Sequence, residues 1–390
     1  MENINKPDMA DRRNGDMGTY KERLEELFNA KKSFFSLTDA GKEKFIDLCK
    51  SVLTHNGYTV SARSGVSGLS QENWFMAYPI EEKLVIAVAS SALFALDEAD
   101  TVFRNEGVRA YREYQRKHEN DVLAPGIAFP FVRRFLELNT IFPERQPAEV
   151  VLLSRNDSDT GMRVFNSIEH YNLGIIRAAF TRGNSPFRYI PAYNVSLFLS
   201  GNEFDVTEAL NNGYPAGLVL PSAANDNAAD TELRVAFDFD GVIADDSAEK
   251  IFQTEGIKAF YDSETANAET AISPGPLGDL FRKLGNLRTL EDEREESDPE
   301  YKRFLKTSIV TARSAPAHRR VIHTLRSWNI TVDETHFLGG MDKGRILETL
   351  KPHIFFDDQQ HPHLDAAQKF TPSVHIPFGV AAKKESQKQN

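Results

Sequence analysis

Residues 233–256, LRVAFDFDGVIADDSAEKIFQTEG, combine an apolar run, an acidic cluster and the start of a helical pattern. Residues 84–107, LVIAVASSALFALDEADTVFRNEG, align with this stretch without a gap. The matching pairs include Ala87 with Ala236, Asp97 with Asp246, Phe103 with Phe252, and Glu106 with Glu255. Chance rarely keeps such a register, so we predict that the chain contains two copies of one structural plan.

The correspondence continues along both copies. Residues 151–173 align with residues 308–330, after a charged insertion at 291–303 that indicates a solvated excursion. Each copy alternates apolar, strand-like runs with helical patterns, which predicts a parallel sheet with crossover helices. The predicted fold class is therefore α/β, with two tandem Rossmann-type domains that derive from an internal duplication.

The length of 390 residues is sufficient for two domains with separate cores. The predicted domains are residues 76–221 and 232–380, joined by a polar linker at 222–231. Residues 1–75 are predicted to form a partly disordered extension, and residues 381–390 a disordered tail.

Composition limits the class of protein. Hydrophobic residues make up 41% and charged residues 26%, as in soluble globular proteins. The net charge of -11 argues against a broad basic face for a nucleic-acid polymer. No apolar run approaches the roughly 20 residues that span a bilayer, and the N-terminal sequence lacks the pattern of a secretory signal. We therefore expect a cytoplasmic protein without a membrane partner. The single cysteine, Cys49, excludes an intrachain disulfide.

Two helix starts are predicted in the second copy. Asp246 followed by Glu249 is expected to form a capping box. Ser314 is expected to cap the next helix, with Pro316 in its first turn.

Polar groups follow the predicted strands of the second copy, at the ends where ligands collect in parallel sheets. They are Asp238 and Asp240 after the first strand, Thr311 after the second, Lys343 on a later turn, and Asp357 and Asp358 after the last strand. A D-x-D motif alone is a weak signal, because aspartates are common at turns. Four such elements in this order predict a catalytic site.

Each of these residue types has a chemical reason. Asp238 can attack phosphorus to form an aspartyl-phosphate, and Asp240 can protonate the leaving alkoxide and then activate water. Lys343 and the Thr311 hydroxyl can hold the phosphoryl oxygens. Clustered carboxylates need a hard cation, so Mg²⁺ is the expected cofactor. The predicted metal ligands are Asp238, Asp240, Asp357 and Asp358.

The four motifs resemble those of haloacid dehalogenase-like (HAD) phosphatases. More specific stretches resemble the cytosolic 5'-nucleotidase I family: SRNDSDTGMRVFNSIEHYNL at 154–173, TRGNSP at 181–186, VTARSAPA at 310–317 and KPHIFFDDQ at 351–359. The resemblance covers about residues 84–379. It implies Mg²⁺-dependent hydrolysis of AMP or related ribo- and deoxyribonucleoside 5'-monophosphates. Phe239 stands between the two aspartates where that family often has glycine, so the resemblance does not fix the substrate preference.

The first copy lacks the catalytic groups and is predicted to be degenerate. The aligned replacements are Ala89 for Asp238, Ser91 for Asp240, Pro186 for Lys343, and Ser200 and Gly201 for Asp357 and Asp358. A hydroxyl survives as Ser154 in place of Thr311. We expect this copy to shape or cover the active half, so that Arg155, Asn156 and Asn184 affect nucleotide affinity.

Substrate contacts are expected from Thr311, Ala312, Arg313 and Lys343. For Arg313, a plain surface arginine at a helix start is an equal alternative. His361 and His363 are interpreted as solvated loop histidines, because the proline between them prevents helical ligand spacing.

The predicted function is a 5'-nucleotidase whose partner is a nucleoside monophosphate. Two alternatives stay open: a phosphatase for another small phosphate monoester, and a nucleotide-binding regulator with little turnover. Neither the base preference nor the formation of a homo-oligomer can be read from the sequence.

Overall fold

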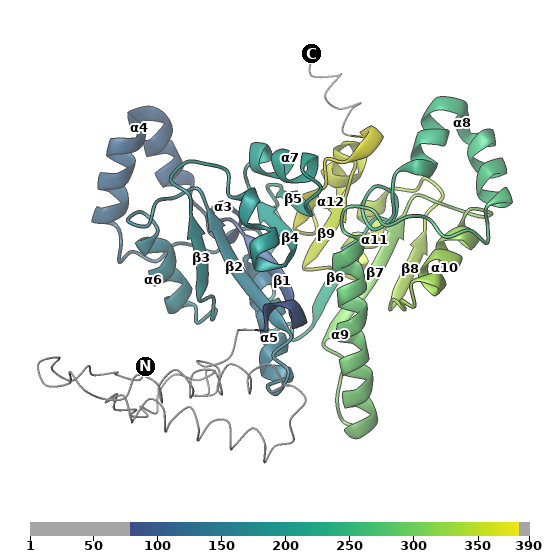
Figure 1. Ribbon diagram of the computed structural model, residues 1–390, viewed down its shortest axis with the longest axis horizontal. Helices are drawn as coiled ribbons and strands as arrows, with labels where there is room; N and C mark the ends of the chain where they lie inside the picture. The colour runs from purple at the N-terminus through teal and green to yellow at the C-terminus, as the bar shows by residue number, and fades with distance from the viewer. Residues whose placement is uncertain (1–78, 382–390) are drawn as a thin grey trace, which may run out of the picture. The chain divides into compact units, whose positions relative to one another are not determined.

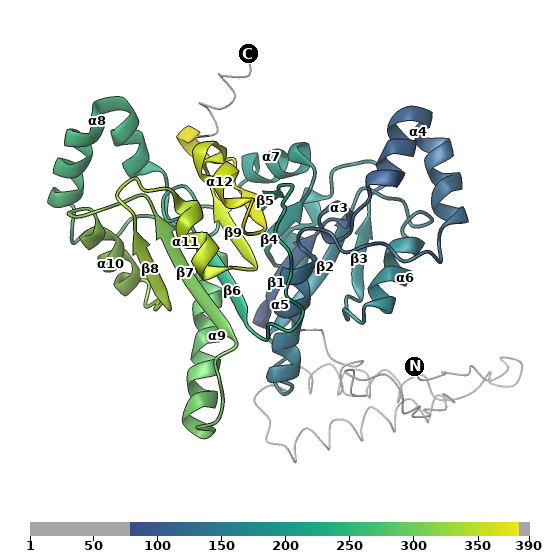
Figure 2. The same cartoon turned by 180° about the vertical axis from the view of Figure 1, so that it is seen from behind.

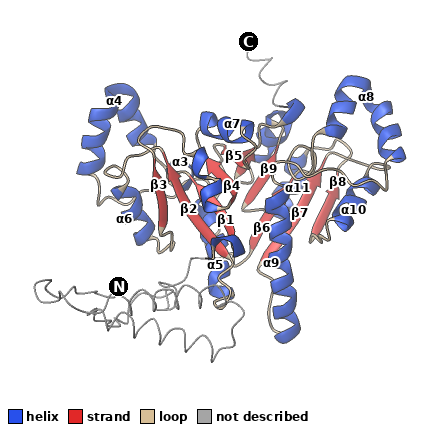
Figure 3. Cartoon of the chain, viewed as in Figure 1, coloured by secondary structure: helices blue, strands red, loops and turns tan. Residues whose placement is uncertain are grey.

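The computed structural model describes residues 79–381, and the predicted extension at 1–75 therefore lies outside it. The described residues form a mixed α/β fold with one ten-stranded sheet (Figure 1). Its strand order is β3-β2-β1-β4-β5-β10-β9-β6-β7-β8. Helices flank the strands in Figure 3. The predicted α/β class with a largely parallel sheet is confirmed.

The first half contributes five neighbouring strands to the sheet. They are β1 (Leu84–Val88), β2 (Ala148–Ser154), β3 (Arg177–Phe180), β4 (Val195–Ser200) and β5 (Ala216–Val219). Every residue of β1, β2 and β4 is buried, as is typical of parallel strands covered on both faces. The helices of this half are α3 (Ser90–Leu93), α4 (Asp97–Lys117), α5 (Phe129–Ile141), α6 (Met162–His170) and α7 (Glu203–Asn211), with short 3₁₀ turns η3 (Ile80–Glu82), η4 (Phe187–Tyr189) and η5 (Pro191–Tyr193).

The second half contributes the other five strands. They are β6 (Leu233–Phe237), β7 (Leu305–Thr311), β8 (Glu334–Phe337), β9 (Ile354–Asp357) and β10 (Ser373–His375). The helices are α8 (Ser247–Ala266), α9 (Gly278–Ser297), α10 (His318–Ser327), α11 (Lys343–Leu350) and α12 (Asp365–Ala367), with the π-helical turn η6 (Gln360–Leu364) before α12. Within residues 79–381, no helix has both the length and the apolar character needed to cross a bilayer.

The two halves meet at an antiparallel pair of strands, where Val374 lies opposite Val219. On either side of this pair, neighbouring strands run parallel. Helix α9 contacts β1 and β4, and α5 contacts β6, so each half packs a helix against the strands of the other. Figure 2 shows this junction from behind.

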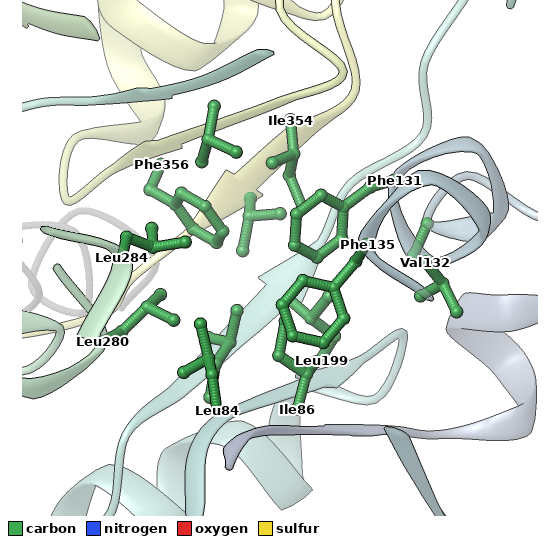
Figure 4. Close-up of a cluster of buried hydrophobic side chains, with 14 of the residues drawn as sticks. Leu84, Ile86, Phe131, Val132, Phe135, Leu199, Leu280, Leu284, Ile354 and Phe356 are labelled. Atoms are coloured by element: carbon green, nitrogen blue, oxygen red, sulfur yellow. The ribbon is translucent and has the colours of Figure 1, made fainter. Parts of the chain in front are cut away.

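One hydrophobic cluster spans the junction (Figure 4). Its first-half members include Ile86, Phe135 and Leu199, and its second-half members include Leu284 and Phe356. All five side chains are buried. The junction therefore removes apolar surface of both halves from water.

Helices α4 and α8 bend sharply at a glycine, as Figure 1 shows at the upper left and upper right. The φ angle is 81° at Gly107 and 85° at Gly256. Side chains with a Cβ rarely adopt this conformation, so glycine permits the bend at both places.

The predicted side-chain caps of both helices require correction. Helix α8 begins at Ser247 as expected, but the Asp246 side chain accepts a hydrogen bond from the backbone N–H of Val380 and caps nothing. Helix α10 begins at His318 rather than at Ser314. The Ser314 hydroxyl lies 3.0 Å from the hydroxyl of Tyr261 in α8 instead. Each of the two side chains contacts a residue that is distant in sequence instead of capping its helix.

Candidate active site

The predicted polar residues of the second half converge at the carboxyl end of the sheet. Strand β6 lies between β7 and β9, so the residues that end these strands are neighbours. Asp238 follows β6, Thr311 ends β7 and Asp357 ends β9, with Asp358 directly after it. Lys343 is the first residue of α11 rather than part of a turn.

Lys343 joins two of the carboxylates. Its Nζ atom lies 2.7 Å from Oδ2 of Asp238 and 2.7 Å from Oδ2 of Asp357. All three side chains are almost fully buried. Burial alone would lower the pKa of Lys343, but the two carboxylates raise it above its usual value. The lysine is therefore charged and fixes both acids in place.

The two acids differ in their electrostatic surroundings. Burial raises the pKa of the Asp238 carboxyl to about 6, although Lys343 favours its charged form. Burial acts on Asp357 as well, but Lys343 and His363 hold its pKa at about 2. Asp357 is thus the permanently charged partner of the lysine, and Asp238 the less strongly stabilised anion.

Asp358 is a buried carboxylate that the described residues leave partly unsatisfied. Its Oδ1 atom has no hydrogen-bond partner within residues 79–381, and the residue is 1% exposed. Burial, followed by the charges of Asp357 and Asp238, raises its pKa well above the ordinary value. A buried carboxylate of this kind requires a proton or a cation.

The turn after Asp240 fits closely against Asp358. Gly241 has a φ of 70°, and a Cβ at this position would overlap the Asp358 carboxylate. Glycine is therefore required both for the turn and for the close approach.

Arg313 is a buried partner of Asp240 and no surface residue, so the surface alternative is wrong. Its Nε and Nη2 atoms each donate to one Asp240 oxygen at 2.7 Å. Its Nη1 atom donates to Glu264, which is buried near the end of α8 and also accepts from Arg320 at 2.8 Å. Glu264 could not be predicted from the sequence, because a helical pattern does not indicate a partner that lies 49 residues away.

The interpretation of His363 as a solvated loop histidine is wrong. Its Nδ1 atom lies 3.2 Å from Oδ1 of Asp357, and its side chain is 15% exposed. His361 is a solvated histidine as expected, with an exposed side chain paired to Asp365. The irregular η6 turn, rather than a regular helix, brings one histidine to the site and leaves the other in solvent.

The residues present suit a divalent cation. Among the described residues, one group of acids and histidines offers ligand atoms within 4.8 Å of one another: Asp238, Asp357 and His363. Of the other two predicted ligands, Asp358 has an unsatisfied oxygen nearby in sequence, whereas the Asp240 carboxylate is engaged by Arg313. A donor set dominated by carboxylate oxygens is what a hard cation prefers.

Two of the predicted substrate contacts are Thr311, which ends β7, and Ala312, which follows it. Ala312 is exposed, and the Oγ1 atom of Thr311 accepts from the backbone N–H of Arg313 at 3.2 Å. The Thr311 side chain is buried, and the contacts of Thr311 and Ala312 with a substrate stay predictions.

The corresponding strand ends of the first half carry no carboxylate. Ala89 follows β1, Ser154 ends β2 and Ser200 ends β4. The hydroxyl of Ser154 lies 3.0 Å from that of Ser90. Of the residues expected to influence nucleotide affinity, Arg155 and Asn156 line a pocket formed only by first-half residues. Asn184 bonds within its own turn, to the carbonyl of Thr181.

The chain is similar in sequence to known proteins. A family model described as 5'-nucleotidase matches residues 76–383. Cytosolic 5'-nucleotidase 1B from Homo sapiens is 35% identical over 295 residues, which cover 73% of this chain and 47% of that protein. The chain thus spans about half the length of this curated relative. No solved structure matches the chain.

Proposed function

Because the chain belongs to the 5'-nucleotidase family, as its resemblance to the cytosolic 5'-nucleotidase I family predicted, we propose that it hydrolyses nucleoside 5'-monophosphates to nucleosides and phosphate. Members of this family are phosphoric monoester hydrolases. The observation that supports the proposal most directly is the buried contact of Lys343 with both Asp238 and Asp357. The word "cytosolic" in the relative's name supports a cytoplasmic location.

In the first step, an oxygen of the Asp238 carboxylate attacks phosphorus, and the bond from phosphorus to the 5'-oxygen breaks. Asp240 gives its proton to that oxygen, which leaves as the nucleoside hydroxyl. Lys343 and the Thr311 hydroxyl hold the phosphoryl oxygens while their charge redistributes.

In the second step, water attacks phosphorus of the aspartyl-phosphate and gives a proton to Asp240. The bond from phosphorus to Asp238 breaks, which releases phosphate and restores both carboxyl groups. Arg313 engages both oxygens of Asp240. One of these contacts must therefore open whenever Asp240 takes up a proton.

The proposed cofactor is Mg²⁺, held by carboxylates from the predicted set of Asp238, Asp240, Asp357 and Asp358. The unsatisfied oxygen of Asp358 and the grouping of Asp238 with Asp357 support a cation at this place. When bound, Mg²⁺ neutralises the clustered carboxylates and the phosphoryl oxygens. The Asp240 carboxylate is the least suited of the four, because Arg313 occupies it.

We further infer that the two halves arose by internal duplication of a HAD-like domain, with boundaries near 76–221 and 232–380, and that the first half is catalytically degenerate. The strand order supports this inference, since it runs 3-2-1-4-5 through the first half and 8-7-6-9-10 through the second. The bends at Gly107 and Gly256, which occupy aligned positions, support it independently.

The test measures phosphate release from AMP, other nucleoside monophosphates and sugar phosphates, with Mg²⁺ and with EDTA. We expect nucleotides to be preferred, EDTA to abolish activity, and Asp238→Asn to lower turnover by several powers of ten, roughly as for other covalent nucleophiles. Equal activity in EDTA would overturn the metal-dependent mechanism. A preference for sugar phosphates would favour the general phosphatase, and binding without turnover would favour the regulator.

A further inference from the structure

The first half contains a pocket of about 590 Å³ at the carboxyl ends of β1, β2 and β4. This volume lies in the range of small-molecule sites. The pocket is lined at the strand ends by Ala89, Ser154 and Ser200, and on the side of α4 by Phe103, Val108 and Tyr111. It occupies the position that corresponds to the catalytic site of the second half, but its walls have a different chemistry.

The aligned residues show that the first half lacks the strand-end carboxylates and carries arginines at two other positions. The four strand-end aspartates of the second half are absent, whereas Arg155 stands where the second half has Ala312, and Arg182 where it has Gly339. The two loops match in backbone conformation, with φ angles of 49° at Arg182 and 58° at Gly339. The pocket therefore lacks the strand-end carboxylates of the second half and has two additional arginines, a residue type that binds anions directly.

Three carboxylates, those of Asp100, Asp157 and Asp205, line the pocket beside its three arginines, and two of these arginines are paired with them. Arg155 pairs with Asp205 through Nε and Nη2, at 2.8–3.0 Å. Arg112 pairs with Asp157 at 2.6 Å. Arg182 is exposed and has no ion pair or side-chain hydrogen bond to any of the residues 79–381. Arg182 is thus the arginine of the pocket that is available to an anion.

A buried hydrogen-bond donor adds a second indication of a ligand. The Oδ1 atom of Asn156 accepts from the Tyr111 hydroxyl at 3.0 Å, which fixes the orientation of the amide. Its Nδ2 atom is buried without a partner among the described residues. A buried donor without an acceptor is costly, and an acceptor on a ligand would satisfy it.

The α4 side of the pocket presents apolar surface to solvent. Phe103 is 47% exposed and Val108 is 55% exposed, although both line the pocket. The ring of Phe103 packs edge-to-face against Tyr111, with centroids 5.8 Å apart. A flat aromatic group is a suitable partner for such a wall.

We propose that this pocket binds a nucleotide without a metal ion and without turnover. The free guanidinium of Arg182 and the Asn156 amide receive the phosphate, and Phe103 and Val108 contact the base. No strand-end carboxylate is present to act as a nucleophile. The site is separate from the proposed catalytic site and does not depend on its activity.

The experiment measures AMP binding to the full chain by calorimetry in excess EDTA, which removes the metal from the second half. We expect about one AMP per chain. Arg182→Ala and Phe103→Ala should each weaken binding by at least about tenfold. Inorganic phosphate and adenosine, used as separate probes, should lose affinity with Arg182→Ala and with Phe103→Ala, respectively.

Two variants serve as matched controls. Phe252→Ala changes the residue that aligns with Phe103 in the second half, and Arg188→Ala removes an exposed arginine outside the pocket. Both should bind AMP in EDTA within about twofold of the unmodified chain. Arg182 is exposed, so its removal should preserve folding, which thermal melts verify. Absence of binding in EDTA, or binding that only Phe252→Ala weakens, would overturn the proposal even if Mg²⁺-dependent hydrolysis is intact.

Discussion

Asp240 and Ser91 occupy aligned positions in the two halves and allow a comparison at the level of one side chain. Asp240→Asn removes the proposed acid and base but keeps Asp238, the proposed nucleophile, so phosphate release from AMP should fall by at least about a hundredfold. p-Nitrophenyl phosphate should lose less, because its leaving group needs no proton. Ser91→Ala should leave the chemical step unchanged. Single-turnover rates on both substrates measure the difference.

Thermal melts of the two variants establish that each is folded. Equal losses for Asp240→Asn and Ser91→Ala would contradict the assignment of catalysis to the second half alone. A loss for Asp240→Asn that is the same on both substrates would contradict its role as the acid.

His353 predicts a specific dependence of stability on pH. Burial, together with the charges of Arg134 and Arg234, lowers the pKa of His353 from 6.5 to about 4. The Nδ1 atom of His353 accepts a hydrogen bond from the backbone N–H of Arg234 at 3.0 Å, which requires the neutral ring nitrogen. The folded state therefore binds a proton at His353 less readily than the unfolded state does.

Because the folded pKa lies below the unfolded pKa, this contribution to stability is complete above pH 6.5 and is lost as the pH falls to about 4. It amounts to no more than about 3 kcal/mol. His353→Asn keeps an acceptor but cannot be protonated, so its free energy of unfolding should fall less across this window. Urea unfolding at several pH values measures both proteins. Parallel curves for the two proteins would exclude His353 as the origin.

At the scale of elements, buried strands could be predicted more securely than helix starts. The strand at 235–237 and the helix after Asp246 follow from apolar runs and periodicity, and both are present. The capping roles of Asp246 and Ser314 failed, because Val380 and Tyr261 bind these side chains across long sequence separations. Periodicity identifies which elements form, whereas the partners of polar side chains depend on how elements pack.

Helix α8 is linked to Asp240, the proposed catalytic acid, through Glu264 and Arg313. Glu264→Gln leaves Arg313 and Arg320 with one carboxylate fewer in a buried cluster, so the melting temperature should fall. If Arg313 positions Asp240, hydrolysis of AMP should decrease by at least about tenfold and hydrolysis of p-nitrophenyl phosphate by less. A merely structural role would reduce both activities equally. Thermal melts and rates on the two substrates test this.

The first half supplies the matched control. Gln115 aligns with Glu264, and its Oε1 atom accepts from Arg163, which aligns with Arg320, at 3.4 Å. Gln115→Glu adds a carboxylate beside that arginine and should leave the chemical step unaffected. A comparable loss of AMP hydrolysis from Gln115→Glu would contradict a specific link between α8 and Asp240.

At the scale of the whole molecule, the sequence predicted several of the polar residues that meet at the strand ends, but not all of them. Asp238, Lys343 and Asp357 could be assigned because parallel strands bring their carboxyl ends together. His363 and Glu264 could not, because one lies on an irregular turn and the other is separated from Arg313 by a long stretch of chain. The junction of the halves could not be predicted either, because apolar periodicity identifies buried faces but not the elements that pack against them.

The continuous sheet and the shared cluster predict that both halves unfold together. Leu152 in β2 and Ile309 in β7 occupy aligned, fully buried positions. Leu152→Ala and Ile309→Ala should each lower the free energy of unfolding by about 2–5 kcal/mol. Trp328 packs on the second-half part of the cluster. When Trp74 is replaced by Phe, Trp328 is the single tryptophan, so its fluorescence reports unfolding of the second half. If the halves are one cooperative unit, Leu152→Ala shifts the urea midpoint of Trp328 fluorescence as much as that of circular dichroism. An unchanged Trp328 midpoint in Leu152→Ala, with a shifted one in Ile309→Ala, would mean that the halves unfold as independent domains.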